Sequence, residues 1–223
     1  MFDDIDLNFD FTADLELDEP RFLDINAVLF SNEKKERVLL DFNQGTRQLS
    51  AALRNFDKDK VYRFISGGKG FSSINFIDFV TKKFGAIKRL YVSTLGVGKK
   101  HIEHLAQLPI EYAFFVFSGI FKDSKIIQDY GYYSRFIEIC KSKKWEYCEA
   151  KNHSKIMLLE VMNGGGCFVV EGSGNLNENP KIEQFTFQED KNLFDWYLEF
   201  FEAIKHYARG DMLQVDSEDN EEE

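Results

Sequence analysis

The sequence predicts an α/β fold, in which a mostly parallel mixed sheet is flanked by helices on both faces. Strand-like and helix-like segments alternate along most of the 223 residues. Because parallel strands need a crossover connection, usually a helix, this alternation favours such a sheet. Hydrophobic residues make up 43% and charged residues 30% of the chain, which is typical of a folded domain. The 23 phenylalanines predict a core filled by aromatic rings.

Hydrophobic periodicity and turn residues place the individual elements. Strands are expected at residues 38–42, 61–68, 88–97, 110–120, 145–161, 167–173 and 182–187. Helices are expected at residues 47–56, 72–85, 98–109, 132–144 and 191–210, the second opened by a serine cap and the last ended by Gly210. The dipeptide Asn163-Gly164 predicts a hairpin between the strands on either side of it.

The charge is distributed unevenly along the chain. Residues 1–24 carry a net charge of −8 and residues 211–223 carry −7, so the total of −10 leaves +5 for residues 25–210. We therefore expect an acidic N-terminal segment (1–24), one α/β domain (25–210) and an acidic disordered C-terminal tail (211–223). The mildly basic body is compatible with an anionic substrate, and the tails could dock on a basic protein partner.

The lack of a recognisable targeting signal and the number of cysteines predict a cytoplasmic protein. The longest nearly apolar run, residues 112–121, is half the length of a membrane span, and the N-terminus has no basic region or apolar signal segment. Three cysteines, at positions 140, 148 and 167, lack the spacing of a metal site and leave an odd thiol. Buried reduced thiols in a reducing compartment are the expectation.

Several candidate motifs are explained without chemistry. Gly67–Gly70 (GGKG) follows a strand and precedes a helix, but it lacks the spacing of nucleotide-binding loops and is expected to be a tight turn. His101 and His104 lie three residues apart without an evident third ligand, so we expect a solvated helix face and no metal. His206, near the end of the closing helix, is assigned no role.

Two polar clusters lie on strands that otherwise appear buried. His153 and Lys155 are two residues apart, so on a strand they would project together, roughly 6.6 Å apart along the chain. The predicted hairpin brings Ser173 and Asn175 near them. Lysine and neutral donors can hold phosphate oxygens while a histidine attacks phosphorus or moves a proton. Glu183 could accept the second N–H of the imidazole and fix its tautomer.

The combination is more specific than either cluster. An H-x-K pattern arises by chance in roughly a quarter of chains of this length, whereas a G-S-x-N within about 25 residues lowers the chance to the order of one in a thousand. A set of surface residues without a shared role is the alternative.

These residues resemble the phospholipase D superfamily and its HKD motif. The matching order is His153-Ser154-Lys155, Glu160 after four apolar positions, then Gly172 to Leu176 (GSGNL), then Glu183. The element order from Val38 to Tyr207 is similar as well, and the short form resembles single-motif members from bacteria and phages. Glu160 stands where the family usually has Asp, and the connection from Glu160 to Gly172 is longer than usual.

The resemblance implies a role for each residue. His153 matches the histidine that becomes phosphorylated, and Lys155 the lysine that binds phosphate oxygens. Ser173 and Asn175 match the hydroxyl and amide of the phosphate pocket, and Glu183 the carboxylate that orients the imidazole. The position of Glu160 is generally more structural than catalytic. No metal and no other cofactor is implied.

The expected function is that of a metal-independent phosphodiesterase with a phosphohistidine intermediate. A second histidine must protonate the leaving group, so the single motif implies a homodimer. A soluble single-motif form favours a nuclease acting on DNA or RNA. The alternatives are a phospholipid or other phosphodiester hydrolase, and a non-catalytic phage or mobile-element binding or structural protein that retains the fold.

Overall fold

The computed structural model describes residues 36–42, 45–66, 71–119, 131–177 and 182–218. All of these residues belong to one compact unit, Lys35–Glu223. The boundary predicted at residue 24 and the turn predicted at Gly67–Gly70 lie outside the described residues. The predicted division into an N-terminal segment, a domain and a tail therefore stays a prediction.

Eight strands, five α-helices and one 3-10 turn make up the described fold. The strands are β1 (Glu36–Phe42), β2 (Lys60–Ser66), β3 (Ile87–Thr94), β4 (Ile110–Ser118), β5 (Glu146–Ala150), β6 (Ile156–Val161), β7 (Cys167–Gly172) and β8 (Glu183–Glu189). The α-helices are α1 (Gly45–Ala52), α2 (Ile74–Phe84), α3 (Lys99–Leu105), α6 (Tyr132–Lys143) and α7 (Lys191–Glu218). A 3-10 turn, η1 (Met162–Gly164), joins β6 to β7.

The strands form one mixed sheet in the order β1-β2-β8-β7-β6-β3-β4-β5. Three neighbouring pairs are parallel and four are antiparallel. The α/β class is confirmed, but the expectation of a mostly parallel sheet is wrong. The alternation of strand and helix holds only as far as β5. Beyond it, β6, β7 and β8 follow one another without a crossover helix, so they pair antiparallel.

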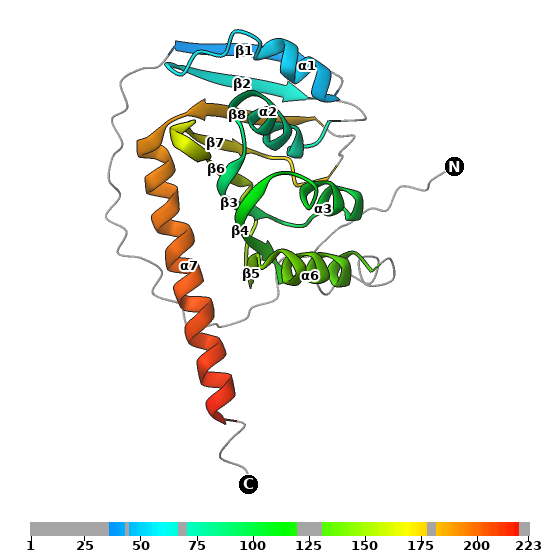
Figure 1. Cartoon of the computed structure of the whole chain (residues 1–223), viewed down its shortest axis with the longest axis vertical. Helices are drawn as coiled ribbons and strands as arrows, with labels where there is room; N and C mark the ends of the chain where they lie inside the picture. Colours follow the sequence, from blue (N-terminus) through cyan, green and yellow to red (C-terminus); the bar gives the residue numbers. More distant parts are fainter. Residues whose placement is uncertain (1–35, 43–44, 67–70, 120–130, 178–181, 219–223) are drawn as a thin grey trace, which may run out of the picture. The chain divides into compact units, whose positions relative to one another are not determined.

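Helices cover both faces of the sheet, as the sequence predicts. One face packs into a buried cluster that includes residues from α1, α2, α3 and α6, and the other packs against α7. Figure 1 shows α7 on the opposite side of the strands from α2, α3 and α6. No helix among the described residues is long and apolar enough to cross a membrane.

Aromatic rings fill the core, as the abundance of phenylalanine predicts. Phe168 and Phe187, on neighbouring strands β7 and β8, stack with their centroids 5.6 Å apart. Phe76 of α2 stacks on Phe187 at 5.6 Å, which joins the helix to the sheet. The largest fully buried side chains are almost all phenylalanines, namely Phe64, Phe76, Phe114, Phe115, Phe117, Phe136, Phe168, Phe187, Phe194 and Phe201. Truncating one such ring to alanine costs about 3–5 kcal/mol.

The predicted hairpin is present. β6 and β7 pair antiparallel from Ile156 opposite Glu171 to Glu160 opposite Cys167. Asn163 and Gly164 in η1 have φ values of 56° and 75°, the left-handed conformation for which asparagine and glycine are suited.

Two other expectations need correction. The strand expected at residues 145–161 is two strands, β5 and β6, which lie on opposite sides of the β3–β4 pair. The chain turns at Asn152, whose side-chain oxygen accepts the N–H of Ser154 at 2.9 Å and so replaces strand pairing locally. Helix α7 also does not end at Gly210 but continues to Glu218, into the predicted disordered tail. A single glycine costs a helix only about 1 kcal/mol, and the residues after it are compatible with a helix.

A candidate active site at one edge of the sheet

The sheet topology brings four strand ends to one edge. β6 runs antiparallel to β3, with Ile156 opposite Ser93. β7 runs antiparallel to β6, with Glu171 opposite Ile156, and β8 antiparallel to β7, with Phe185 opposite Gly172. The end of β3, the start of β6, the end of β7 and the start of β8 therefore lie together. All five residues that the sequence predicts for the site belong to this edge.

His153 and Lys155 lie in the segment just before β6 and contact each other directly. The Lys155 ammonium Nζ is 3.1 Å from His153 Nδ1 and also donates to the His153 carbonyl oxygen. An ammonium group only donates, so Nδ1 accepts and the ring proton is on Nε2 as long as Lys155 is charged. An anion that draws the ammonium away would release the Nδ1 lone pair of an exposed imidazole.

The glycines of the GSGN segment allow its backbone to lie close to the Phe185 ring. A Cβ on Gly172 would lie 2.6 Å from the ring of Phe185, and a Cβ on Gly174 would also lie 2.6 Å from it. The segment therefore follows the face of a buried aromatic ring that only glycine can approach so closely. The N–H of Gly172 donates to the Lys155 carbonyl oxygen at 3.1 Å, so this segment is bonded to the one that carries His153.

Ser173 and Glu183 form a pair across the ends of β7 and β8. The Ser173 hydroxyl donates to the Glu183 carboxylate and accepts the N–H of Gln184 at 3.0 Å. The backbone N–H of Ser173 donates to the Gln184 carbonyl oxygen, also at 3.0 Å, which extends the ladder by one residue. The carboxylate thus holds the hydroxyl in place. The predicted role of Glu183 in orienting an imidazole stays a prediction.

The Asn175 carboxamide has a defined orientation. Its Oδ1 accepts the backbone N–H of Leu95 at 3.0 Å and the Thr94 hydroxyl at 3.2 Å. Because a backbone N–H can only donate, the atom that faces Leu95 must be the oxygen. The Nδ2 group is therefore the one left to donate elsewhere, as binding of a phosphate oxygen requires. The Asn175 carbonyl oxygen accepts the Ser73 hydroxyl at 2.9 Å.

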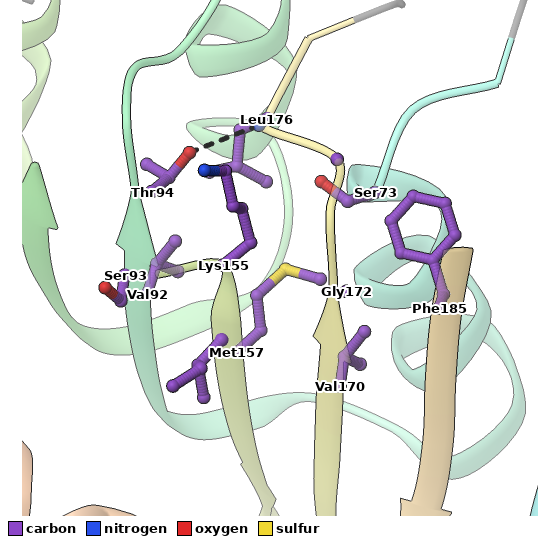
Figure 2. A pocket seen from close by; sticks show the side chains of 12 residues that line it. Ser73, Val92, Ser93, Thr94, Lys155, Met157, Val170, Gly172, Leu176 and Phe185 are labelled. Atoms are coloured by element: carbon purple, nitrogen blue, oxygen red, sulfur yellow. Dashed lines mark hydrogen bonds between the residues drawn. The ribbon is translucent and has the colours of Figure 1, made fainter. Parts of the chain in front are cut away.

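Lys155 lies partly inside the protein. Burial lowers the pKa of its ammonium from the usual 10.5, and the nearby charge of Glu183 offsets part of this. Figure 2 shows its side chain extending from the start of β6 toward Thr94 and Leu176. The hollow beside it has a volume of about 10 Å³, which is room for one water molecule and not for a phosphate group. A phosphate must therefore bind on the outer, exposed side of Lys155.

Sequence reasoning missed the residues that support the site. Thr94 and Leu95 at the end of β3 hold Asn175, although Thr94 is 81 positions away along the chain. Of the two serines before α2, Ser72 accepts the Ile74 N–H at 3.4 Å, whereas the Ser73 hydroxyl makes no cap and donates to the Asn175 carbonyl oxygen instead. The sequence predicts that Asn152 lies within a strand. Its only sequence signal is that asparagine is depleted in strands and favoured in turns.

The other polar residues discussed above lie away from the five predicted site residues or have partners within the fold. His101 is buried, and His104 Nε2 is 2.7 Å from the Asp78 carboxylate, so the expected solvated helix face is wrong. Glu160 lies at the far end of β6, where Arg89 and Lys88 bond its carboxylate. His206 is exposed in the middle of α7 rather than in its last turn. Within the described residues, no group of three or more His, Cys, Asp or Glu is arranged to hold a metal ion.

Comparison with known proteins gives a partial likeness only. No protein-family model matches the chain, and no curated protein sequence is significantly similar to it. Yeast tyrosyl-DNA phosphodiesterase matches at 14% identity and a TM-score of 0.33, over 46% of this chain and 26% of that one. A variant of that enzyme matches at 11% identity and a TM-score of 0.34, over 56% and 32%.

A third solved structure is that of TrmBL2, an archaeal chromatin protein. It matches at 14% identity and a TM-score of 0.38, over 72% of this chain and 58% of that one. The chain spans about a quarter to a third of the length of the yeast enzyme chains that it matches. At these scores the function has to be argued from the site.

Proposed function

We propose that this chain is a metal-independent phosphodiesterase of the phospholipase D type, acting on nucleic acid through a phosphohistidine at His153. One observation carries the proposal. A contacting His153–Lys155 pair lies beside Ser173 and an Asn175 amide whose donor group has no acceptor among the described residues. One nucleophile, one cation and two neutral donors at one exposed edge match the needs of phosphoryl transfer.

The chemistry follows from these groups. A phosphodiester binds with its non-bridging oxygens on the Lys155 ammonium and the Asn175 amide, and the Ser173 hydroxyl adds a third donor once it leaves Glu183. The imidazole nitrogen attacks phosphorus, an N–P bond forms and the P–O bond to the leaving group breaks. A general acid protonates the leaving alkoxide, and water then attacks the phosphohistidine and restores the free imidazole.

The general acid comes from a second copy of the chain. The five predicted site residues include a single histidine, His153, and the step needs two. The exposed position of His153 and the small hollow beside Lys155 suit a site that is completed by a partner. We expect an isologous homodimer with the two site edges facing each other. Light scattering checks this, and a monomer at micromolar concentration with full activity would contradict it.

Nucleic acid is the substrate that the charge distribution favours. Residues 25–210 carry +5, and Lys99, Lys100 and Lys151 are exposed in the segments that follow β3 and β5. The ends of these strands lie at the site edge, because β3, β4 and β5 are parallel. Cations beside the scissile phosphate attract the neighbouring phosphates of a polynucleotide.

The test is to incubate the purified chain, with and without EDTA, with single- and double-stranded DNA, RNA and phospholipid vesicles. The expected result is cleavage of nucleic acid that EDTA does not change, together with an acid-labile adduct in which phosphorus joins His153 to the retained part of the nucleic acid, detected by mass spectrometry. Cleavage of phospholipid alone would support the lipid hydrolase instead. Tight binding of nucleic acid without turnover would favour the non-catalytic binding protein.

A further inference from the structure

We propose that Asn152 is a positioning residue that fixes His153, and with it the phosphoryl-transfer geometry, to the ends of β3 and β4. The inference rests on the role proposed above for His153. Asn152 is neither an acid, a base nor a nucleophile, and it lies outside the H-x-K and G-S-x-N patterns. Its importance comes from its hydrogen bonds.

The Asn152 side chain joins three parts of the chain. Its Nδ2 group donates to the Thr94 carbonyl oxygen at 3.2 Å and to the Val116 carbonyl oxygen at 3.1 Å. These are carbonyls near the ends of β3 and β4, two neighbouring parallel strands. Its Oδ1 accepts the Ser154 N–H at 2.9 Å and lies 2.8 Å from the Ser154 hydroxyl and 3.1 Å from the Ser93 hydroxyl. The two hydroxyls also bond each other, so one of them donates to Oδ1 while the other donates to its neighbour.

These bonds admit only one orientation of the carboxamide. The Ser154 N–H can only donate, so it must face the oxygen, and the two backbone carbonyls can only accept, so they must face the nitrogen. Both amide hydrogens and the oxygen are occupied. A fully satisfied polar group of this kind holds its neighbours rigidly, because rotation would leave several polar atoms unpaired.

The position of His153 follows from this arrangement. It lies between Asn152 and Ser154, which the same side chain ties together and to the sheet. His153 itself is exposed, and the hydrogen bonds that the structure gives its side chain and carbonyl come from Lys155 two residues later. Without Asn152, the segment that carries His153 would be attached to the sheet before β6 only by the backbone bond between Gly172 and Lys155 and by the contact between the Ser154 and Ser93 hydroxyls. Catalytic groups held on rigid elements keep the geometry that the reaction needs.

The test compares Asn152→Ala with a destabilising control away from the site. Val169→Ala, on the α7 face of β7, removes buried methyl groups and lowers stability without touching the edge. Two quantities are measured: hydrogen exchange at the Ser154 N–H, and the rate of phosphohistidine formation in a single turnover on a DNA oligonucleotide.

Asn152→Ala is expected to speed exchange at Ser154 about tenfold, because one hydrogen bond is lost. It is expected to slow phosphohistidine formation about 10²-fold, because small misplacements of a reacting group have effects of that size. Substrate affinity should change little, since Lys155 and Asn175 remain. Asn152→Asp, which is nearly isosteric but places oxygen against two carbonyl oxygens, should slow the same step, and Ser93→Ala should slow it less.

The result that overturns the inference is phosphohistidine formation in Asn152→Ala at the rate of the Val169→Ala control, or unchanged exchange at Ser154. Failure of the proposed function is distinguishable from this. A wild-type chain that never forms phosphohistidine would overturn both, whereas an active wild type with an unimpaired Asn152→Ala variant would overturn the inference alone.

Discussion

The two ends of the β6–β7 hairpin both carry charged residues, but in opposite arrangements. At the turn end, the Glu160 carboxylate is bonded by Arg89 on the facing strand and by Lys88 at 3.1 Å. At the open end, the Lys155 ammonium is bonded to the neutral acceptors of His153, and burial lowers its pKa. The first end pairs opposite charges, while the second holds a cation beside the proposed nucleophile.

Under the proposed function, the charges at the turn end stabilise the fold and the lysine at the open end binds substrate. At the turn end, hydrogen bonds and charges from Arg89 and Lys88 outweigh the effect of burial, which by itself would raise the pKa of Glu160, and the net pKa is lowered. That pairing stabilises the fold. For Lys155, the cost of burying the charged ammonium exceeds the stabilisation that the nearby Glu183 charge provides, so the net pKa is lowered. A bound anion would therefore stabilise this charge. Variants at the two ends should therefore affect different measurements.

The largest expected effect is that of His153→Ala. Removing the proposed nucleophile should lower the turnover rate on the order of 10⁴-fold, while the melting temperature stays unchanged because the side chain is exposed. Substrate affinity should persist through Lys155 and Asn175. Single-turnover kinetics and calorimetry measure these quantities. Wild-type turnover in this variant would exclude a phosphohistidine at this position.

Lys155→Ala is expected to weaken substrate binding about 10- to 100-fold and to lower turnover as well, because a charged hydrogen bond to phosphate is lost. Lys88→Ala at the turn end is the matched control, since it removes a lysine without approaching the site. Equal losses of substrate affinity in the two variants would mean that Lys155 contributes only general electrostatic attraction and no specific bond to the phosphate.

The lowered pKa of Lys155 predicts how substrate binding and stability depend on pH. Because its pKa in the folded chain is below 10.5, substrate binding should begin to weaken at a lower pH than an ordinary lysine would allow. The unfolded chain binds more protons between the two pKa values, so this lysine makes stability rise with pH across that window. Binding titrations from neutral pH upward, with Lys155→Arg as comparison, measure the first effect.

Glu160→Gln should affect stability and leave the chemistry unchanged. Loss of the charge at a partly buried pair is expected to cost about 1 kcal/mol of unfolding free energy at neutral pH. The folded pKa of Glu160 is lowered, so its contribution is present above the unfolded value, near 4.5, and is lost as pH falls through the folded value. Urea unfolding at neutral and acidic pH, with turnover assays at neutral pH, tests both. A large fall in turnover would give Glu160 a catalytic part.

The same hairpin shows how far the sequence leads. Asn163-Gly164 and the apolar runs on either side of it predicted the β6–β7 hairpin, because turn chemistry and local hydrophobicity are local properties. The break at Asn152 was missed, since the residues around it fit one long strand and the decisive bonds go to Thr94 and Val116. Those partners are 58 and 36 positions away, and no spacing rule reveals them.

In the candidate site, too, some residues could be predicted from the sequence and others could not. His153, Lys155, Ser173, Asn175 and Glu183 were predicted from residue type and order, and the structure brings them to one edge. Their supports were not predicted, because a hydroxyl such as that of Ser73 has several local uses and its actual partner depends on tertiary packing. The mixed sheet was misjudged for a related reason. Strand order and direction depend on which connections carry a helix, and that alternation stops at β5.

The smallest expected effect concerns the acidic ends of the chain. Residues 1–24 carry −8 and residues 211–223 carry −7, against +5 for the body, so they should compete with a nucleic acid for the exposed lysines. Deleting both segments is expected to tighten DNA binding several-fold at low salt and hardly at all at 0.5 M salt, where charges are screened within a few ångströms. Fluorescence anisotropy at several salt concentrations measures this, with charge-neutral Asn and Gln replacements as the control for lost packing. If deleting residues 1–24 alone leaves binding unchanged and lowers the melting temperature, the N-terminal segment would instead belong to the fold through its Phe and Leu residues.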